Sequence, residues 1–140
     1  MKGDHCLKTW SSTQKNITLS SAEAELVAAV KMSTELIGML QLATDWSITM
    51  TGRVLVDSTA ALGVVKRHGC GRLRHIRVGM LWVQQKQEAG ELTYDKVPGQ
   101  ENPGDLMTKH LTDTVICRHM GALGQEWRTG RADISLSIAV

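Results

Sequence analysis

The pattern of hydrophobic and polar positions along the chain predicts strands and helices in alternation. The clearest short apolar run is Val54-Leu55-Val56, which predicts a strand buried on both faces. This run ends on Asp57, and the following residues, from Ser58 onward, predict a helix that reaches about Lys66. An acid at the carboxyl end of a buried strand lies where open α/β sheets place ligand sites.

A long helix is predicted from about residue 20 to about residue 45. It begins at the sequence of a capping box, in which Ser20 caps the helix and Glu23 follows three residues later. Its apolar face is formed by Leu26, Val30, Ile37 and Leu40.

The remaining pattern completes an α/β order. Strands are predicted at residues 5–13 and 91–97, and a helix from Ile76 to Gly90. Asn102-Pro103 is a typical helix start. Residues 114–123 favour a short helix, and 131–140 show no pattern. We therefore predict an α/β domain with parallel neighbouring strands over 1–111, followed by a tail at 112–140.

Composition narrows the class of protein. A chain of 140 residues with 42% hydrophobic and 21% charged residues is typical of one globular domain. Three widely separated cysteines favour a reducing compartment over a disulfide framework. No signal peptide and no apolar run near the length of a membrane span are apparent in the sequence. The expected location is therefore intracellular, cytoplasmic or nuclear, without membrane contact.

Basic side chains cluster in one segment, although the net charge of +2 gives no strong global field. Residues 66–77 form a loop with two glycines that leads into a predicted helix. Such clusters are often merely solvated, yet this arrangement is also suited to phosphate contact. The candidate nucleic-acid-binding residues are Lys66, Arg67, Arg72, Arg74, His75 and Arg77.

Three acids lie at predicted element boundaries: Glu25, Asp57 and Asp105. Each has an ordinary structural explanation. Asp57 could cap the next helix, Asp105 could favour a helix dipole, and an isolated helical Glu25 could simply be solvated. Gathered at one end of a sheet, however, three carboxylates repel one another unless a cation neutralises them. Hard oxygen ligands suit magnesium or manganese, and paired ions support phosphodiester cleavage.

Several motifs in order resemble a known family. They are Ser11-Ser12-Thr13-Gln14-Lys15, Leu19-Ser20-Ser21-Ala22-Glu23-Ala24-Glu25, Val56-Asp57-Ser58-Thr59-Ala60-Ala61, Arg74-His75-Ile76, Val97-Pro98-Gly99 and Asn102-Pro103-Gly104-Asp105-Leu106-Met107-Thr108-Lys109. Together they resemble the ribonuclease H domain of copia-type LTR retrotransposon polyproteins, over roughly residues 5–111.

The resemblance implies a ribonuclease H-like fold, a five-stranded mixed sheet with flanking helices. It implies hydrolysis of the RNA strand of RNA–DNA hybrids through two Mg²⁺ (or Mn²⁺) ions held by four carboxylates. By position, Glu25, Asp57 and Asp105 match the second, third and fourth acids, and the capping box already uses Glu23. Ser21 and Thr59 match the family's minor-groove contacts. The implied partners are the hybrid and the reverse transcriptase portion of the parent polyprotein.

The sequence also departs from the family. The first acid and the first two strands have no counterpart, including the strand that should pair with the Asp57 strand. Gln100-Glu101 stands where cellular relatives carry a histidine. We therefore expect an amino-terminally truncated enzyme that is impaired as an isolated chain. The alternatives are a non-catalytic nucleic-acid-binding remnant of a degenerate retrotransposon, or a chain with no function.

Overall fold

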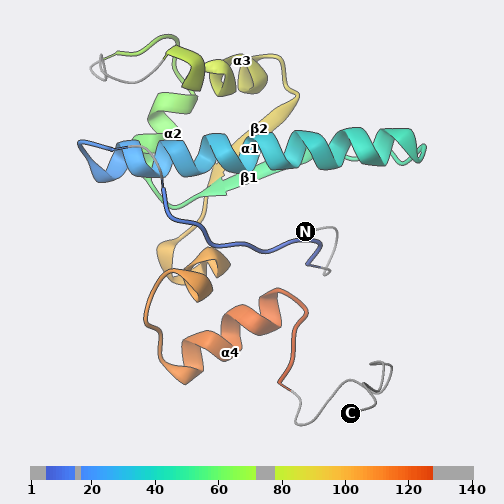
Figure 1. The fold of residues 1–140 in the computed structure, drawn as a ribbon, viewed down its shortest axis with the longest axis vertical. Helices are drawn as coiled ribbons and strands as arrows, with labels where there is room; N and C mark the ends of the chain where they lie inside the picture. The colour runs from blue at the N-terminus through green and yellow to red at the C-terminus, as the bar shows by residue number, and fades with distance from the viewer. Residues whose placement is uncertain (1–5, 15–16, 72–77, 128–140) are drawn as a thin grey trace, which may run out of the picture. The chain divides into compact units, whose positions relative to one another are not determined.

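The computed structural model describes residues 6–14, 17–71 and 78–127, in two compact parts. Each part is described by itself. Elements of the part Ser12–Asn102 are α1 (Ser21–Asp45), β1 (Gly52–Val56), α2 (Thr59–Val65), η1 (Val78–Met80), α3 (Trp82–Glu88), β2 (Leu92–Lys96) and η2 (Gly99–Glu101) (Figure 1). Elements of the other part are η3 (Pro103–Met107) and α4 (Asp113–Ala122).

The start of α1 confirms the predicted capping box. The Ser20 side chain accepts a hydrogen bond from the Glu23 amide, at 3.3 Å. In return, the Glu23 carboxylate accepts the Leu19 amide at 2.7 Å. Glu23 is buried, so its side chain satisfies a helix-end donor and is not offered to a ligand.

The length and composition of α1 differ from the sequence expectation about membranes. Among the described residues, α1 is the one helix that is both long enough and apolar enough to cross a membrane. Its mean hydropathy is 1.4 over a window of 18 residues. Core helices of soluble proteins pass the same test. Of that window, 22% is buried, and Leu26 and Ala29 of α1 belong to the hydrophobic core.

The sheet consists of β1 and β2 in parallel, with Val54 opposite Tyr94 and Val56 opposite Lys96. Burial alternates along β1: Gly52, Val54 and Val56 are buried, whereas Leu55 is 50% exposed. The prediction that this strand is buried on both faces is therefore wrong. The inner face packs on α1 and α2, and no described element of this part covers Leu55 on the outer face.

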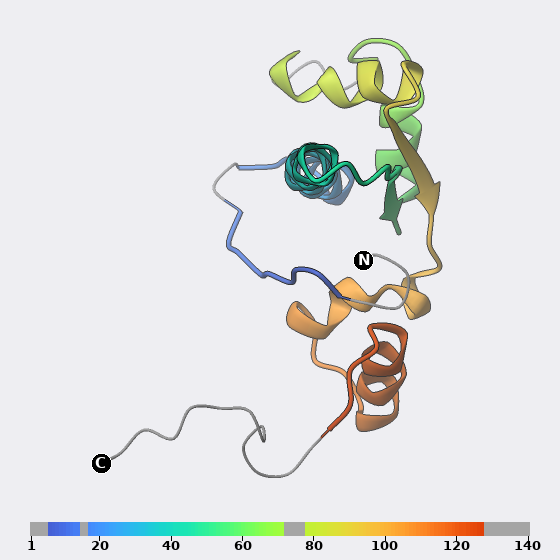
Figure 2. The ribbon, with the colours of Figure 1, turned by 90° about the vertical axis from the view of Figure 1, so that its right-hand side faces the viewer.

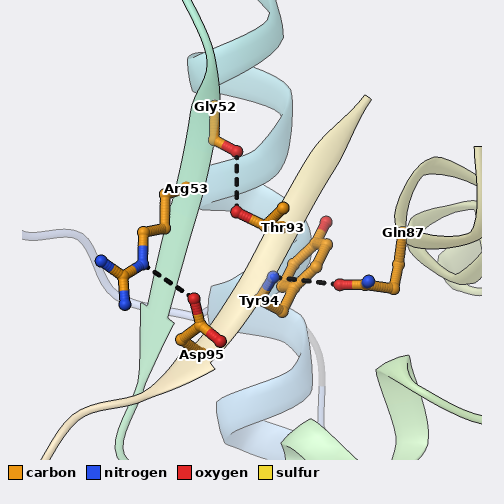
Figure 3. Close-up of polar contacts among 6 residues, drawn as sticks. All are labelled: Gly52, Arg53, Gln87, Thr93, Tyr94 and Asp95. Carbon is orange, nitrogen blue, oxygen red and sulfur yellow. Dashed lines mark hydrogen bonds and ion pairs between the residues drawn. The ribbon is translucent and has the colours of Figure 1, made fainter. Parts of the chain in front are cut away.

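The two edges of this sheet differ. On β2, the outward-facing Tyr94 amide donates to Oε1 of Gln87 on α3, at 3.0 Å (Figure 3). On β1, the peptide oxygens of Gly52 and Val56 face β2. The Gly52 oxygen accepts from the Thr93 hydroxyl, and the Val56 oxygen accepts from the Val97 amide. Peptide groups alternate in direction along a strand, so those of Arg53 and Leu55 point to the opposite edge. That edge of β1 has no strand beside it in the described part of the chain.

A buried hydroxyl chain joins α1 to β2. Ser33 donates to the Ala29 carbonyl at 2.7 Å, so its single proton is used. The Tyr94 hydroxyl, also 2.7 Å away, therefore donates to Ser33 Oγ. Burial raises the pKa of Tyr94 above its ordinary value of 10.0.

Several predicted elements are confirmed and others are corrected. The helix at 20–45, the strand ending before Asp57 and the helix at 114–123 correspond to α1, β1 and α4. The predicted strand at 5–13 is wrong for residues 6–13, which form no strand, since β-formers need a neighbouring strand to bond with. The described part of the helix predicted from Ile76 to Gly90 is split into η1 and α3.

The architecture seen is mixed α/β with four α-helices and one two-stranded parallel sheet in the described residues. Figure 2 shows α1 end-on, lying beside the two strands. This sheet is smaller than the five-stranded mixed sheet that the resemblance implies.

Tyr94 gives a test of this core. Because its folded-state pKa is raised, its hydroxyl ionises first in the unfolded chain, and stability falls as pH rises above about 10. We expect Tyr94→Phe to cost about 1 kcal/mol at neutral pH, for the lost hydrogen bond. The same variant should lose less free energy of unfolding than wild type between pH 9 and pH 11, measured by urea denaturation. An equal alkaline loss in both proteins would contradict the assignment.

Candidate functional site

Asp57 follows β1 directly, and its side chain is half-buried. The N-cap of α2 is the next residue: Ser58 Oγ accepts the Ala61 amide at 3.2 Å. The interpretation of Asp57 as the helix cap is therefore wrong. Its carboxylate instead accepts one hydrogen bond, from Asn102 Nδ2 to Oδ2 at 3.3 Å. In the described part of the chain, the other oxygen of Asp57 has no partner.

A lysine shares this edge of the sheet. Val56 and Lys96 are register partners, so β1 and β2 end together and place Asp57 and Lys96 at one edge. The Lys96 ammonium donates to the hydroxyl of Thr59, at the exposed start of α2. The sequence-predicted Thr59 thus lies beside a cation at the carboxyl ends of parallel strands, the usual position for ligands in α/β proteins.

Two residues at this edge were missed by sequence reasoning. Asn102 was interpreted only as a helix start, and Lys96 was assigned no role. Lys96 could have been found from its position near the end of the predicted strand at 91–97. Parallel strands that end together bring their last residues to one edge of the sheet. No comparable signal marked the Asn102 side chain, because its contact with Asp57 joins residues far apart in sequence.

Glu25 lies in the second turn of α1 and is half-buried. Ser21 is four residues earlier on the same face and is exposed. The segment preceding α1 is held against it, because Gln14 donates to the Ala24 carbonyl at 3.2 Å and Lys31 donates to Ser12 at 2.6 Å. In this structure, the motif that contains Ser12 and Gln14 therefore has a structural role beside Glu25.

Asp105 has a local partner of its own. It lies in η3, is only 9% exposed, and pairs with Lys109, whose ammonium is 2.9 Å from its carboxylate. It belongs to the part Pro103–Val140, whereas Glu25 and Asp57 belong to Ser12–Asn102. The Lys109 pair neutralises this buried carboxylate within its own part of the chain.

The chemistry of the three acids suits a hard divalent ion, since all are carboxylates. Their grouping is a separate matter. Among the described residues, no group of three His, Cys, Asp or Glu side chains could hold a metal ion. The assignment of the three acids to one metal site therefore stays a prediction.

The basic segment is described as far as residue 71. Lys66 and Arg67 follow α2, whereas Arg72, Arg74, His75 and Arg77 lie outside the described residues. The buried Gln84 of α3 holds the described part of this loop. Its Oε1 accepts the Gly69 amide at 3.0 Å, and its Nε2 donates to the carbonyls of Val64 and Gly69, at 2.7 and 3.0 Å.

Arg67 is fixed within that loop. Its Nη2 donates to the Cys70 carbonyl at 2.8 Å. Gly71 lies against the guanidinium with φ of +55°, and a Cβ there would be 2.5 Å from Arg67 Cζ. The positive φ favours glycine at this position, and a Cβ here would displace the Arg67 guanidinium. Sequence reasoning missed the hydrogen bonds by which Gln84 holds this loop. A polar residue directly after the core residue Val83 was a possible signal.

Comparison with known proteins gives one relevant similarity. No protein-family model matches the chain, and no solved structure matches it. The chain is 30% identical over 104 residues to the retrovirus-related Pol polyprotein from transposon TNT 1-94 of Nicotiana tabacum. The matched stretch covers 72% of this chain but 8% of the polyprotein. The chain is thus distantly similar to a small portion of a copia-type retrotransposon Pol polyprotein.

Proposed function

We propose that this chain is part of the ribonuclease H region of a retrotransposon Pol polyprotein. In that setting it hydrolyses the RNA strand of RNA–DNA hybrids and acts together with the reverse transcriptase portion. The similarity to the tobacco polyprotein supports the retrotransposon relation. The motifs around Glu25, Asp57 and Asp105, in family order, support the ribonuclease H assignment.

One observation carries the proposal: Ser58, and not Asp57, caps α2. The most economical structural role for Asp57 is thereby removed. Its carboxylate lies at the carboxyl edge of a parallel sheet, with Asn102 bonded to one oxygen and Lys96 at the end of the neighbouring strand. A half-buried acid with one hydrogen bond at this edge is suited to a ligand or an ion.

By the order of the family motifs, Glu25, Asp57 and Asp105 are the carboxylates that would hold two Mg²⁺ or Mn²⁺ ions. When bound, such ions lower the pKa of an attacking water and stabilise the leaving oxygen of a phosphodiester. Asn102 orients the Asp57 carboxylate through its hydrogen bond. Lys96 and Thr59, which are bonded to each other, offer a cation and a hydroxyl to the hybrid, and Ser21 offers a second hydroxyl. An ion held by Asp105 would compete with the Lys109 ammonium for this carboxylate.

The open edge of β1 supports a further strand in the intact enzyme. The peptide groups of Arg53 and Leu55 point to this edge, whereas Gln87 covers the edge of β2. A two-stranded sheet alone is marginally stable, so an added strand would also extend the core. We propose that this strand lies outside the 140 residues and carries the fourth acid.

A second candidate is nucleic-acid binding without catalysis. It is favoured by one observation: the hydrogen bonds of Gln84 fix the loop that bears Lys66 and Arg67. This candidate requires binding to a hybrid that is indifferent to magnesium and weakens steeply with salt. Magnesium-dependent cleavage separates the two functions.

Asp57→Asn tests the catalytic assignment in a longer Pol polypeptide that contains these 140 residues. The change keeps the side-chain size and removes the negative charge. We expect cleavage of a labelled RNA–DNA hybrid to fall by about 100-fold or more, and calorimetric Mg²⁺ binding to weaken. The matched control is Asp95→Asn, which makes the same change on β2 and breaks only the surface pair with Arg53. Equal activities in the two variants would refute the role of Asp57.

The isolated chain gives a second test. We expect the 140-residue chain to cleave the hybrid far more slowly than a longer polypeptide that supplies the proposed strand and fourth acid, because no strand lies beside β1 on its open edge among the described residues. Initial rates at equal protein concentration and saturating Mg²⁺ measure the difference. Full turnover by the isolated chain, abolished by Asp57→Asn, would contradict the proposed truncation while supporting the site.

A further inference from the structure

An open pocket of about 350 Å³ lies between the end of α2 and α3. It is lined by Val65, Lys66, Arg67, His68, Gln84, Gln87 and Glu88. All these residues belong to the part Ser12–Asn102. None of them is among the candidate acids, so the pocket needs an explanation separate from the Asp57 edge.

The orientation of the Gln87 carboxamide is set by the backbone. Its oxygen accepts the Tyr94 amide at 3.0 Å (Figure 3), so the donors of the NH₂ group remain on this pocket-lining side chain. This NH₂ group has no hydrogen-bond partner within the described residues. Gln84 differs, since both ends of its carboxamide are used on the loop backbone. Gln87 is therefore a fixed donor, and Gln84 holds the loop in place.

The cations beside Gln87 also have donors that are not used within the described residues. The Lys66 ammonium is exposed and has no partner in the described part of the chain. The Arg67 guanidinium is fixed by Cys70 and Gly71, and its buried Nε finds no acceptor among the described residues. A buried donor without an acceptor is costly and calls for an explanation.

Among the described residues, the only acid lining the pocket is Glu88, whose carboxylate lies 3.9 Å from the His68 imidazole. Both side chains are largely exposed, at 65% and 85%. The pocket therefore offers more donors and positive charge than acceptors. This chemistry matches a tetrahedral oxyanion, whose several acceptor oxygens suit Lys, Arg and amide donors together.

We propose that this pocket binds one backbone phosphate of a nucleic-acid strand, with Lys66, Arg67 and Gln87 as the donors. The proposal deepens the function given above, because it rests on a nucleic acid as the ligand. It depends on neither the acids nor a metal ion. A phosphate seated here positions the strand without reading its sequence, as backbone contacts generally do.

Gln87→Glu is the decisive change. A carboxylate still accepts the Tyr94 amide, so the cover on the β2 edge is kept while the pocket loses its donor and gains a negative charge. The matched control is Gln85→Glu, which adds the same charge on an exposed position of α3 outside the pocket. Binding of a fluorescent RNA–DNA hybrid is measured by anisotropy in EDTA, so a failure of the metal-dependent function leaves this measurement unaffected. We expect Gln87→Glu to weaken binding about tenfold more than the control.

A second pair covers any loss of folding in Gln87→Glu. Lys66→Gln removes a donor at an exposed position, and its control, Lys86→Gln, removes a lysine of α3 that pairs with Glu91. We expect only Lys66→Gln to weaken binding and to reduce the salt slope by about one. Inorganic phosphate, followed by the NMR shift of the Gln87 NH₂ group, tests the other source of the same chemistry. Equal hybrid affinities within each pair would overturn the proposal. A phosphate-induced shift with equal hybrid affinities would assign the pocket to free phosphate and overturn it too.

Discussion

The parallel pairing of β1 with β2 is the constraint on which the candidate site depends. It fixes Val56 opposite Lys96, so both strands end together, and the next residues meet at one edge. The helix α1 covers the inner face through Leu26 and Ala29, which gives the pair its core. A shift of one residue in the pairing would turn Val54 outward and separate Asp57 from the Lys96 edge.

Prediction from the sequence succeeded where local physics decides the structure. The capping box at Ser20 and Glu23 uses neighbours in sequence, and it appeared as expected. The short apolar run before Asp57 also formed a strand, although its pairing with β2 is a long-range contact. The prediction that both faces of this strand are buried failed at Leu55, because exposure depends on which elements cover each face of the sheet. The pattern within one strand carries no information about those elements.

The interactions missed in the site are of the long-range kind. Asn102 reaches Asp57 across 45 positions, and Gln84 reaches Gly69 across 15, so neither contact leaves a local pattern. Both residues are amides whose side chains satisfy groups far away in sequence. The acids themselves could be found because element boundaries are locally encoded. A site built from acids far apart in sequence depends on tertiary contacts, which no local pattern encodes.

The structure ranks the three acids by how well local chemistry already accounts for each. The buried Asp105 has the exposed Lys109 as its counter-ion, so its charge is explained without a ligand. Glu25 stands on an ordinary helix face. Asp57 differs, because Ser58 has taken the cap and a single amide bond leaves much of the carboxylate's hydrogen-bonding capacity unused. An acid at the end of a parallel strand that is not needed by the fold is best explained by function, and Asp57 is therefore the residue on which the ribonuclease proposal stands.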